Sequence, residues 1–127
     1  MREGASALVC DALLASRIFR VAAIYGVVVL LPMYLLDVPD PHKLTQVGFV
    51  GLALVFQAMF WIIANAPVKF RALMPLAVAE KAVFGLPAIA FFALGRTDAV
   101  TAGFGAADLL LGLLFLWVWL GVRRVAA

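Results

Sequence analysis

Four long apolar segments, separated by short polar links, dominate the sequence. They run over about residues 18–36, 47–64, 72–94 and 99–122. Each holds about 18–24 residues, close to the roughly 20 that a helix needs to cross the hydrocarbon core of a bilayer. Because lipid offers no hydrogen bonds, backbone groups in such a segment must satisfy one another, which favours α-helices. The pattern therefore predicts an all-α membrane protein with four transmembrane helices.

The links between these segments are too short to hold a folded domain. Residues 37–43 contain Pro39 and Pro41, which forbid the helix from continuing, and Gly95 is well placed to end the third helix. Short links make consecutive helices antiparallel. We therefore expect residues 1–127 to form one four-helix transmembrane domain, an up-down-up-down bundle.

Residues 1–17 leave two alternatives open. They can form a short helix at the membrane surface, with Leu8, Ala12 and Ala15 on one side, or a frayed terminus. A cleaved signal peptide is not expected, because the first apolar run is longer than the usual 7–15 residues and acidic residues precede it.

Composition supports the membrane interpretation. The chain is 67% hydrophobic and 13% charged, whereas soluble domains are about 45–50% apolar and about 25% charged. Mean hydropathy is +1.14. We therefore expect the lipid bilayer to be the main partner. The formal charge of +3 does not indicate nucleic-acid binding, because the sequence shows no basic stripe and no reader motif.

The basic residues instead predict an orientation. Seven fall on one side of a four-span arrangement, and only Lys43 and Arg96 fall on the other. By the positive-inside rule both termini are expected in the cytoplasm of a bacterium, with the chain a multi-pass protein of the inner membrane. Trp61, Trp117 and Trp119 map to the same side, as an aromatic belt would. The seven basic residues are Arg2, Arg17, Arg20, Lys69, Arg71, Arg123 and Arg124.

Glu80 and Lys81 stand side by side within the third apolar segment. A charged side chain at the centre of a membrane helix costs roughly 2.5–3.5 kcal/mol to insert, so the pair needs partners or a function. Adjacent helical residues point about 100° apart. We expect Glu80 to face the second helix, accepting a hydrogen bond from Gln57, and Lys81 to face the fourth helix through Asp108.

These residues form a predicted polar core. Gln57, Glu80 and Asp108 lie at comparable depths when the rise is about 1.5 Å per residue, and Tyr25 is placed to join them. The core is a candidate proton or ligand site. The alternative is a polar adhesive that holds the helices in register.

No catalytic residue, metal site or cofactor is expected. The sequence shows no nucleophile motif, phosphate loop or haem attachment site. His42 stands alone in its link beside Asp37 and Asp40, which favours a solvated loop over a metal site. An enzymatic role therefore has the thinnest support.

Helix-breaking and small residues carry weaker signals. Pro32, Pro75 and Pro87 lie within apolar segments and are expected to kink or unwind them. Two runs of small residues are expected to allow close helix packing, within the chain or between chains. They are Gly48 with Gly51, and Ala99, Gly103 and Ala107.

Several short motifs resemble those of a group of small four-span bacterial membrane proteins of unknown function. The resemblance covers about residues 21–124 and implies the fold but no activity. It rests on Ile24-Tyr25-Gly26 with Pro32 and Tyr34, Gly48-Phe49-Val50-Gly51 with Gln57, Ala79-Glu80-Lys81, and Asp108-Leu109-Leu110-Leu111-Gly112.

Two main functions remain open. The first is a small integral protein that packs against or assembles a larger membrane complex, or binds a ligand in its polar core. The alternative is a proton-linked small-molecule transporter that uses an intramembrane carboxylate. A chain of 127 residues would then be expected to form a homo-oligomer in order to enclose a pathway.

Overall fold

The computed structural model describes residues 2–126, with side chains described as far as Arg124. This part of the chain is helical and contains no strand. The prediction of an all-α protein is confirmed, with four helical stretches that are long and apolar enough to cross a membrane. The elements are α1 (Arg2–Leu30), η1 (Leu31–Leu35), α2 (Asp40–Asn65), η2 (Arg71–Leu73), α3 (Met74–Ala93) and α4 (Ala99–Ala126), where η marks a 3-10 helix.

The first two helices begin earlier than predicted. Helix α1 starts at Arg2 and runs without interruption into the first apolar segment. Residues 2–17 are therefore helical and not frayed, but they continue into the first apolar segment and do not form a separate short helix; their place at the membrane surface stays a prediction. The start of α1 is held by α4, because Asp11 lies against Gly121 and Ala15 is fully buried. Helix α2 begins at Asp40 with Pro41 in its first turn, where a missing N–H costs no helical hydrogen bond.

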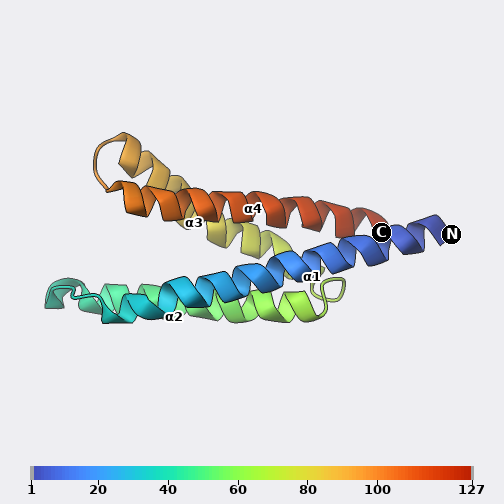
Figure 1. Ribbon diagram of the computed structural model, residues 1–127, viewed down its shortest axis with the longest axis horizontal. Helices are drawn as coiled ribbons and strands as arrows, with labels where there is room; N and C mark the ends of the chain where they lie inside the picture. The colour runs from blue at the N-terminus through green and yellow to red at the C-terminus, as the bar shows by residue number, and fades with distance from the viewer. Residues whose placement is uncertain (1, 127) are drawn as a thin grey trace.

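The helices pair as α1 with α2 and α3 with α4, and α1 also packs along α4 (Figure 1). Helices α2 and α3 make little contact. The start of α1 and the end of α4 lie at one end of the molecule, which we call the terminal end (Figure 1). The opposite end, which carries residues 31–39 and 94–98, we call the link end. At the link end the two helix pairs diverge (Figure 1).

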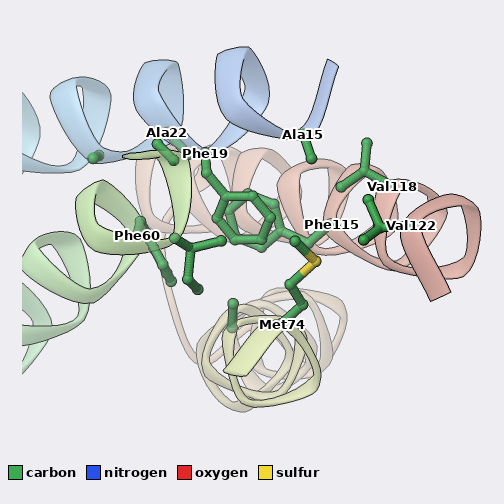
Figure 2. Close-up of a cluster of buried hydrophobic side chains, with 12 residues drawn as sticks. Ala15, Phe19, Ala22, Phe60, Met74, Phe115, Val118 and Val122 are labelled. Atoms are coloured by element: carbon green, nitrogen blue, oxygen red, sulfur yellow. The ribbon is translucent and has the colours of Figure 1, made fainter. Parts of the chain in front are cut away.

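A cluster of buried apolar side chains holds the terminal half together (Figure 2). Phe115 is stacked on Phe19 with ring centroids 4.2 Å apart, and it meets Phe60 edge-on at 5.1 Å. Met74 of α3 closes the cluster. Close packing of these side chains contributes many small dispersion contacts that stabilise the cluster. All four helices are therefore tied at this end.

Small residues allow two helices to pack closely, but most of these residues are not the ones that the sequence predicted. A Cβ on Gly105 would lie 2.5 Å from the Cβ of Ala88, and one on Gly85 would lie 2.9 Å from the Gly105 carbonyl oxygen. Gly48 and Gly103 have no such neighbour within 4 Å. The close α3–α4 contact thus uses another face of α4 than the predicted run, and packing of Gly48 and Gly103 between chains stays a prediction.

The three prolines act differently from one another. Helix α1 gives way to η1 at Leu31, next to Pro32. The Met33 carbonyl accepts hydrogen bonds from the Leu36 N–H at 3.2 Å and from Gln46 Nε2 at 2.6 Å. Local unwinding at Pro32 is thus confirmed. Pro75 lies in the first turn of α3, directly after the 3-10 turn η2, and its missing N–H costs no helical hydrogen bond there. Pro87 lies inside α3, which is α-helical on both sides of it, so a kink at Pro87 stays a prediction. Gly95 ends α3 with φ of +68°, as predicted.

The outer surfaces of the four long helices are apolar. Large hydrophobic side chains are exposed on every one of them, including Val28, Val55, Val83 and Leu113. A soluble monomer rarely exposes such extended apolar surface. Helices with such faces are long and apolar enough to cross a membrane.

Candidate functional site

Lys81 lies between two carboxylates, from α3 and α4. Its Nζ is 3.3 Å from Asp108 Oδ1, to which it donates a hydrogen bond, and 3.4 Å from Glu80 Oε2. The predicted contact of Lys81 with Asp108 across the two helices is confirmed. Gly112 makes room for it, because a Cβ there would lie 3.2 Å from the Lys81 Cβ. These three side chains form the two ion pairs found among the described residues. We call them the charged triad.

The Phe60 ring connects the charged triad to the apolar cluster. Lys81 Nζ lies 5.3 Å from the centroid of this ring, within the range of a cation–π contact. Lys81 is 3% exposed, so its ammonium depends on the two carboxylates and the ring for compensation. The charged triad therefore lies between the terminal end, where all four helices pack together, and the link end, where the helix pairs diverge.

Gln57 does not form the predicted hydrogen bond with Glu80. Its Nε2 donates instead to the carbonyl of Ala53, one turn earlier in α2, at 3.1 Å. The cause is the close approach of α1, where Gly26 leaves a space that the Gln57 amide fills. Any Cβ on Gly26 would collide with that amide. The expectation of a Gln57–Glu80 bond was wrong because it assumed that α2 and α3 pack closely.

Three buried side-chain acceptors are left without a hydrogen-bond donor in the described part of the chain. Gln46 Oε1 lies outside the polar core, and the other two, Gln57 Oε1 and Glu80 Oε2, belong to it. Glu80 Oε2 has the Lys81 charge at 3.4 Å but no donor with good geometry. Leaving a buried acceptor unpaired costs roughly 1–3 kcal/mol, and more for a charged group. Each of the two oxygens therefore lacks a hydrogen-bond partner within the described residues.

Both acceptors belong to residues that line a central cavity of about 360 Å³. All four long helices contribute to its walls. The cavity lies between the two helix pairs because these pairs diverge toward the link end. Tyr25, half-buried on α1, also lines it, so the structure brings all five predicted polar-core residues to one cavity. The other walls are mainly apolar: Leu30, Met33, Phe49, Phe84, Val100 and Phe104.

A second hollow lies between α2 and α3, where these helices make little contact. It has a volume of about 200 Å³ and includes Leu52 and Val83, whose side chains are exposed on the outer surface. Glu80, Phe49 and Phe84 line both this side groove and the central cavity. The Phe49 and Phe84 rings meet across α2 and α3 with centroids 6.0 Å apart. Glu80 thus stands where the groove and the cavity meet.

A larger hollow of about 400 Å³ lies near the link end, beside Arg96 and Thr97. It touches none of the five polar-core residues, and Arg96 is exposed, with its guanidinium 5.4 Å from the Phe91 ring. We place the candidate site in the central cavity, because all five polar-core residues line it, including the charged triad.

The charges at the central cavity do not balance. Glu80 and Asp108 bring two negative charges when ionised, and Lys81 brings one positive charge, which leaves one negative charge uncompensated. An apolar surrounding penalises a net charge. The arrangement can therefore take up a proton or a cation. Among the described residues no cluster of His, Cys, Asp and Glu is arranged to hold a metal ion.

Sequence reasoning missed the residues that create the space. Gly26 and Gly112 admit Gln57 and Lys81 between helices, yet a glycine in an apolar segment gives no sign of which side chain will occupy the gap. The aromatic wall formed by Phe49, Phe84 and Phe104 was also missed. In the sequence these phenylalanines do not differ from the many other apolar residues of the four segments.

Polar contacts at the terminal end surround the ends of the helices. Arg20 Nη2 donates to Asn65 Oδ1 at 3.0 Å, and its guanidinium lies 5.2 Å from the Trp61 ring. Ser16 Oγ donates to the carbonyl of Ala64 at 2.6 Å, which satisfies a helix-terminal acceptor. Tryptophan is a residue that is enriched at membrane–water interfaces.

Comparisons of the chain with protein-family models, with curated proteins and with solved structures found no match.

Proposed function

We propose that the protein is a multi-pass protein of the bacterial inner membrane, an up-down-up-down bundle with both termini in the cytoplasm. The apolar outer faces of all four helices support the membrane location. The excess of basic residues and the tryptophans at the terminal end support the orientation. The bilayer is then the partner of the outer faces, and a homo-oligomer or a larger membrane complex stays a prediction.

We infer further that the bundle binds a small molecule in its central cavity. The observation that carries this proposal is the pair of buried acceptors, Gln57 Oε1 and Glu80 Oε2, left without donors at the cavity. A polar core serving only as adhesive is expected to satisfy its own hydrogen bonds. The volume of about 360 Å³ also lies within the roughly 300–1,000 Å³ typical of ligand sites, with apolar walls and few polar groups.

Thiol protection tests this function. In a Cys10→Ser background, which removes the only cysteine, Val29→Cys places a thiol in the cavity wall. Val55→Cys is the matched control on an exposed face of α2. The purified variants in detergent are treated with methyl methanethiosulfonate in the presence of a library of small amines, acids and neutral lipophiles. We expect at least one class to slow labelling of Val29→Cys and not of Val55→Cys. A library in which no compound protects Val29→Cys would overturn ligand binding.

Proton-linked transport is a second candidate, and the uncompensated negative charge of the triad favours it. A proton and a cationic solute would compete for the same carboxylates, which is the basis of exchange. Liposomes containing the protein and a pH-sensitive dye measure proton movement when a compound that protects Val29→Cys is added. Movement that is lost in Glu80→Gln and Asp108→Asn would support transport, and a silent wild-type protein would exclude it.

A further inference from the structure

Two acceptors at the central cavity lack hydrogen-bond donors, and this indicates the chemistry of the ligand. Gln57 Oε1 and Glu80 Oε2 are both acceptors, and each lacks a donor within the described residues. A ligand head that only accepts hydrogen bonds would leave both unpaired. An ammonium group offers up to three N–H donors and accepts none. The head of the ligand is thus a donor.

The charge of the triad narrows this head to a cation. Two carboxylates share the single ammonium of Lys81, at 3.4 Å and 3.3 Å. A bound carboxylate would add a third negative charge, whereas a protonated amine restores neutrality. A hydrogen bond between a charged donor and a carboxylate is also roughly twice as strong as one between neutral groups. Charge and hydrogen bonding therefore select the same chemistry.

The walls of the cavity select the rest of the ligand. Apart from the five polar-core residues, the walls are formed mainly by apolar side chains, with Phe49, Phe84 and Phe104 among them. An apolar tail fits these walls without leaving polar atoms unpaired. The ligand is accordingly an amphiphile with a cationic head and a short apolar tail.

An amphiphile of this kind concentrates in the bilayer, and the groove between α2 and α3 gives it a path. The groove is bordered by exposed Leu52 and Val83 on the outside and by Glu80 on the inside. Phe49 and Phe84 line the groove and the cavity alike. Helices α2 and α3 make little contact, so few interactions oppose their separation. The carboxylate of Glu80 is therefore within reach of the surrounding lipid.

We propose that the central cavity binds an amphiphilic alkylammonium ion, which enters sideways from the hydrocarbon between α2 and α3 and places its head at Glu80 and Gln57. This rests on the proposed ligand-binding function. Thiol protection by acids or neutral compounds but not by amines would keep that function and contradict the ligand class.

Fluorine NMR of protein in nanodiscs of zwitterionic lipid, with empty nanodiscs as reference, tests the ligand class. The probes are 8,8,8-trifluorooctylammonium, its N-trimethyl analogue and 8,8,8-trifluorooctanoate. The primary ammonium is expected to bind saturably at one site per chain. The trimethyl analogue, which has no N–H, is expected to bind at least tenfold more weakly, and the carboxylate not measurably. Equal binding of carboxylate and ammonium by the wild-type protein would overturn the proposal without reliance on any variant.

Two tryptophan variants test the path with the same ammonium probe. Leu52→Trp fills the groove without touching the central cavity, and Leu113→Trp adds the same bulk at an exposed position of α4 that lines neither. Leu52→Trp is expected to slow exchange between free and bound probe at least tenfold and to leave the affinity within twofold. Leu113→Trp is expected to change neither. Unchanged exchange in Leu52→Trp would overturn sideways entry.

Glu80→Gln completes the test of the head position. The substitution keeps the shape of the side chain and removes its charge, so the affinity for the ammonium is expected to fall at least tenfold. Gln57→Leu, which removes the other unpaired acceptor, is expected to weaken binding severalfold and serves if Glu80→Gln does not fold. Undiminished binding by either variant would show that the head lies elsewhere.

Discussion

Lys81 Nζ donates a 3.3 Å hydrogen bond to Asp108 Oδ1 and thereby joins α3 to α4 within the bundle. The same ammonium lies 3.4 Å from Glu80 Oε2. One cation therefore lies between two carboxylates, one from its own helix and one from the neighbouring helix. Its loss would leave both acids facing each other without a counter-ion, which makes Lys81 the energetic centre of the polar core.

Lys81→Met is expected to lower the free energy of unfolding by about 3 kcal/mol. Removing one partner of a buried pair leaves an uncompensated charge, which typically costs about 3–5 kcal/mol, and the partial exposure of the carboxylates places the effect at the lower end. Unfolding in mixed micelles with increasing sodium dodecyl sulfate measures it. Lys69→Met, which removes an exposed lysine, is the control and is expected to change stability by under about 0.5 kcal/mol.

Neutralising Glu80 and Asp108 should restore the stability that Lys81→Met loses. Lys81→Met combined with Glu80→Gln and Asp108→Asn carries no net charge at the site, so most of the lost stability is expected to return. If the triple variant is as unstable as Lys81→Met alone, packing around the lysine side chain rather than charge compensation holds the two helices.

The sequence allowed a good part of this arrangement to be predicted, and its failures have a common physical origin. Four apolar segments, the Gly95 helix end and the Lys81–Asp108 contact follow from length, composition and helical depth. The Gln57–Glu80 bond failed because depth along a membrane does not say how far apart two helices lie. The bundle opens between α2 and α3, and Gly26 draws Gln57 toward α1. The central cavity is a property of that spacing, which no local pattern encodes.

Phe115→Ala is expected to destabilise the bundle by about 3–5 kcal/mol, as removal of a buried aromatic side chain does. Its ring meets both Phe19 and Phe60 and is fully buried. Leu113→Ala, two residues away on the exposed face of α4, is the control and is expected to cost under about 1 kcal/mol because lipid replaces the lost contacts. Equal losses measured by the same detergent titration would show that the aromatic contacts add nothing to stability.

Acidification is expected to weaken the start of α4. The backbone N–H of Thr101 donates a 2.7 Å hydrogen bond to Asp98 Oδ1 and holds the pKa of that carboxyl below its ordinary value. A lowered folded-state pKa means that Asp98 stabilises the fold above its unfolded pKa of about 3.9 and that this contribution is lost as pH falls through the lower folded value. Hydrogen exchange at the Thr101 amide should therefore be slower in wild type than in Asp98→Ala at pH 6. After correction for intrinsic exchange rates, the difference should shrink below about pH 4, and a constant difference would contradict the role of the charge.

Gly26→Ala tests whether the space on α1 positions Gln57. The added Cβ would collide with the Gln57 amide, so we expect a loss of about 1–3 kcal/mol, as overpacking typically costs. Gly48→Ala is the matched control on α2, where nothing lies within 4 Å of the added Cβ; a gain of about 0.4–1 kcal/mol is expected there, because alanine restricts the unfolded chain more than glycine does. Combining Gly26→Ala with Gln57→Ala should remove the collision and restore most of the stability in detergent titration. If the double variant is no more stable than Gly26→Ala alone, the close approach of the α1 and α2 backbones, and not the glutamine, is what requires glycine at this position.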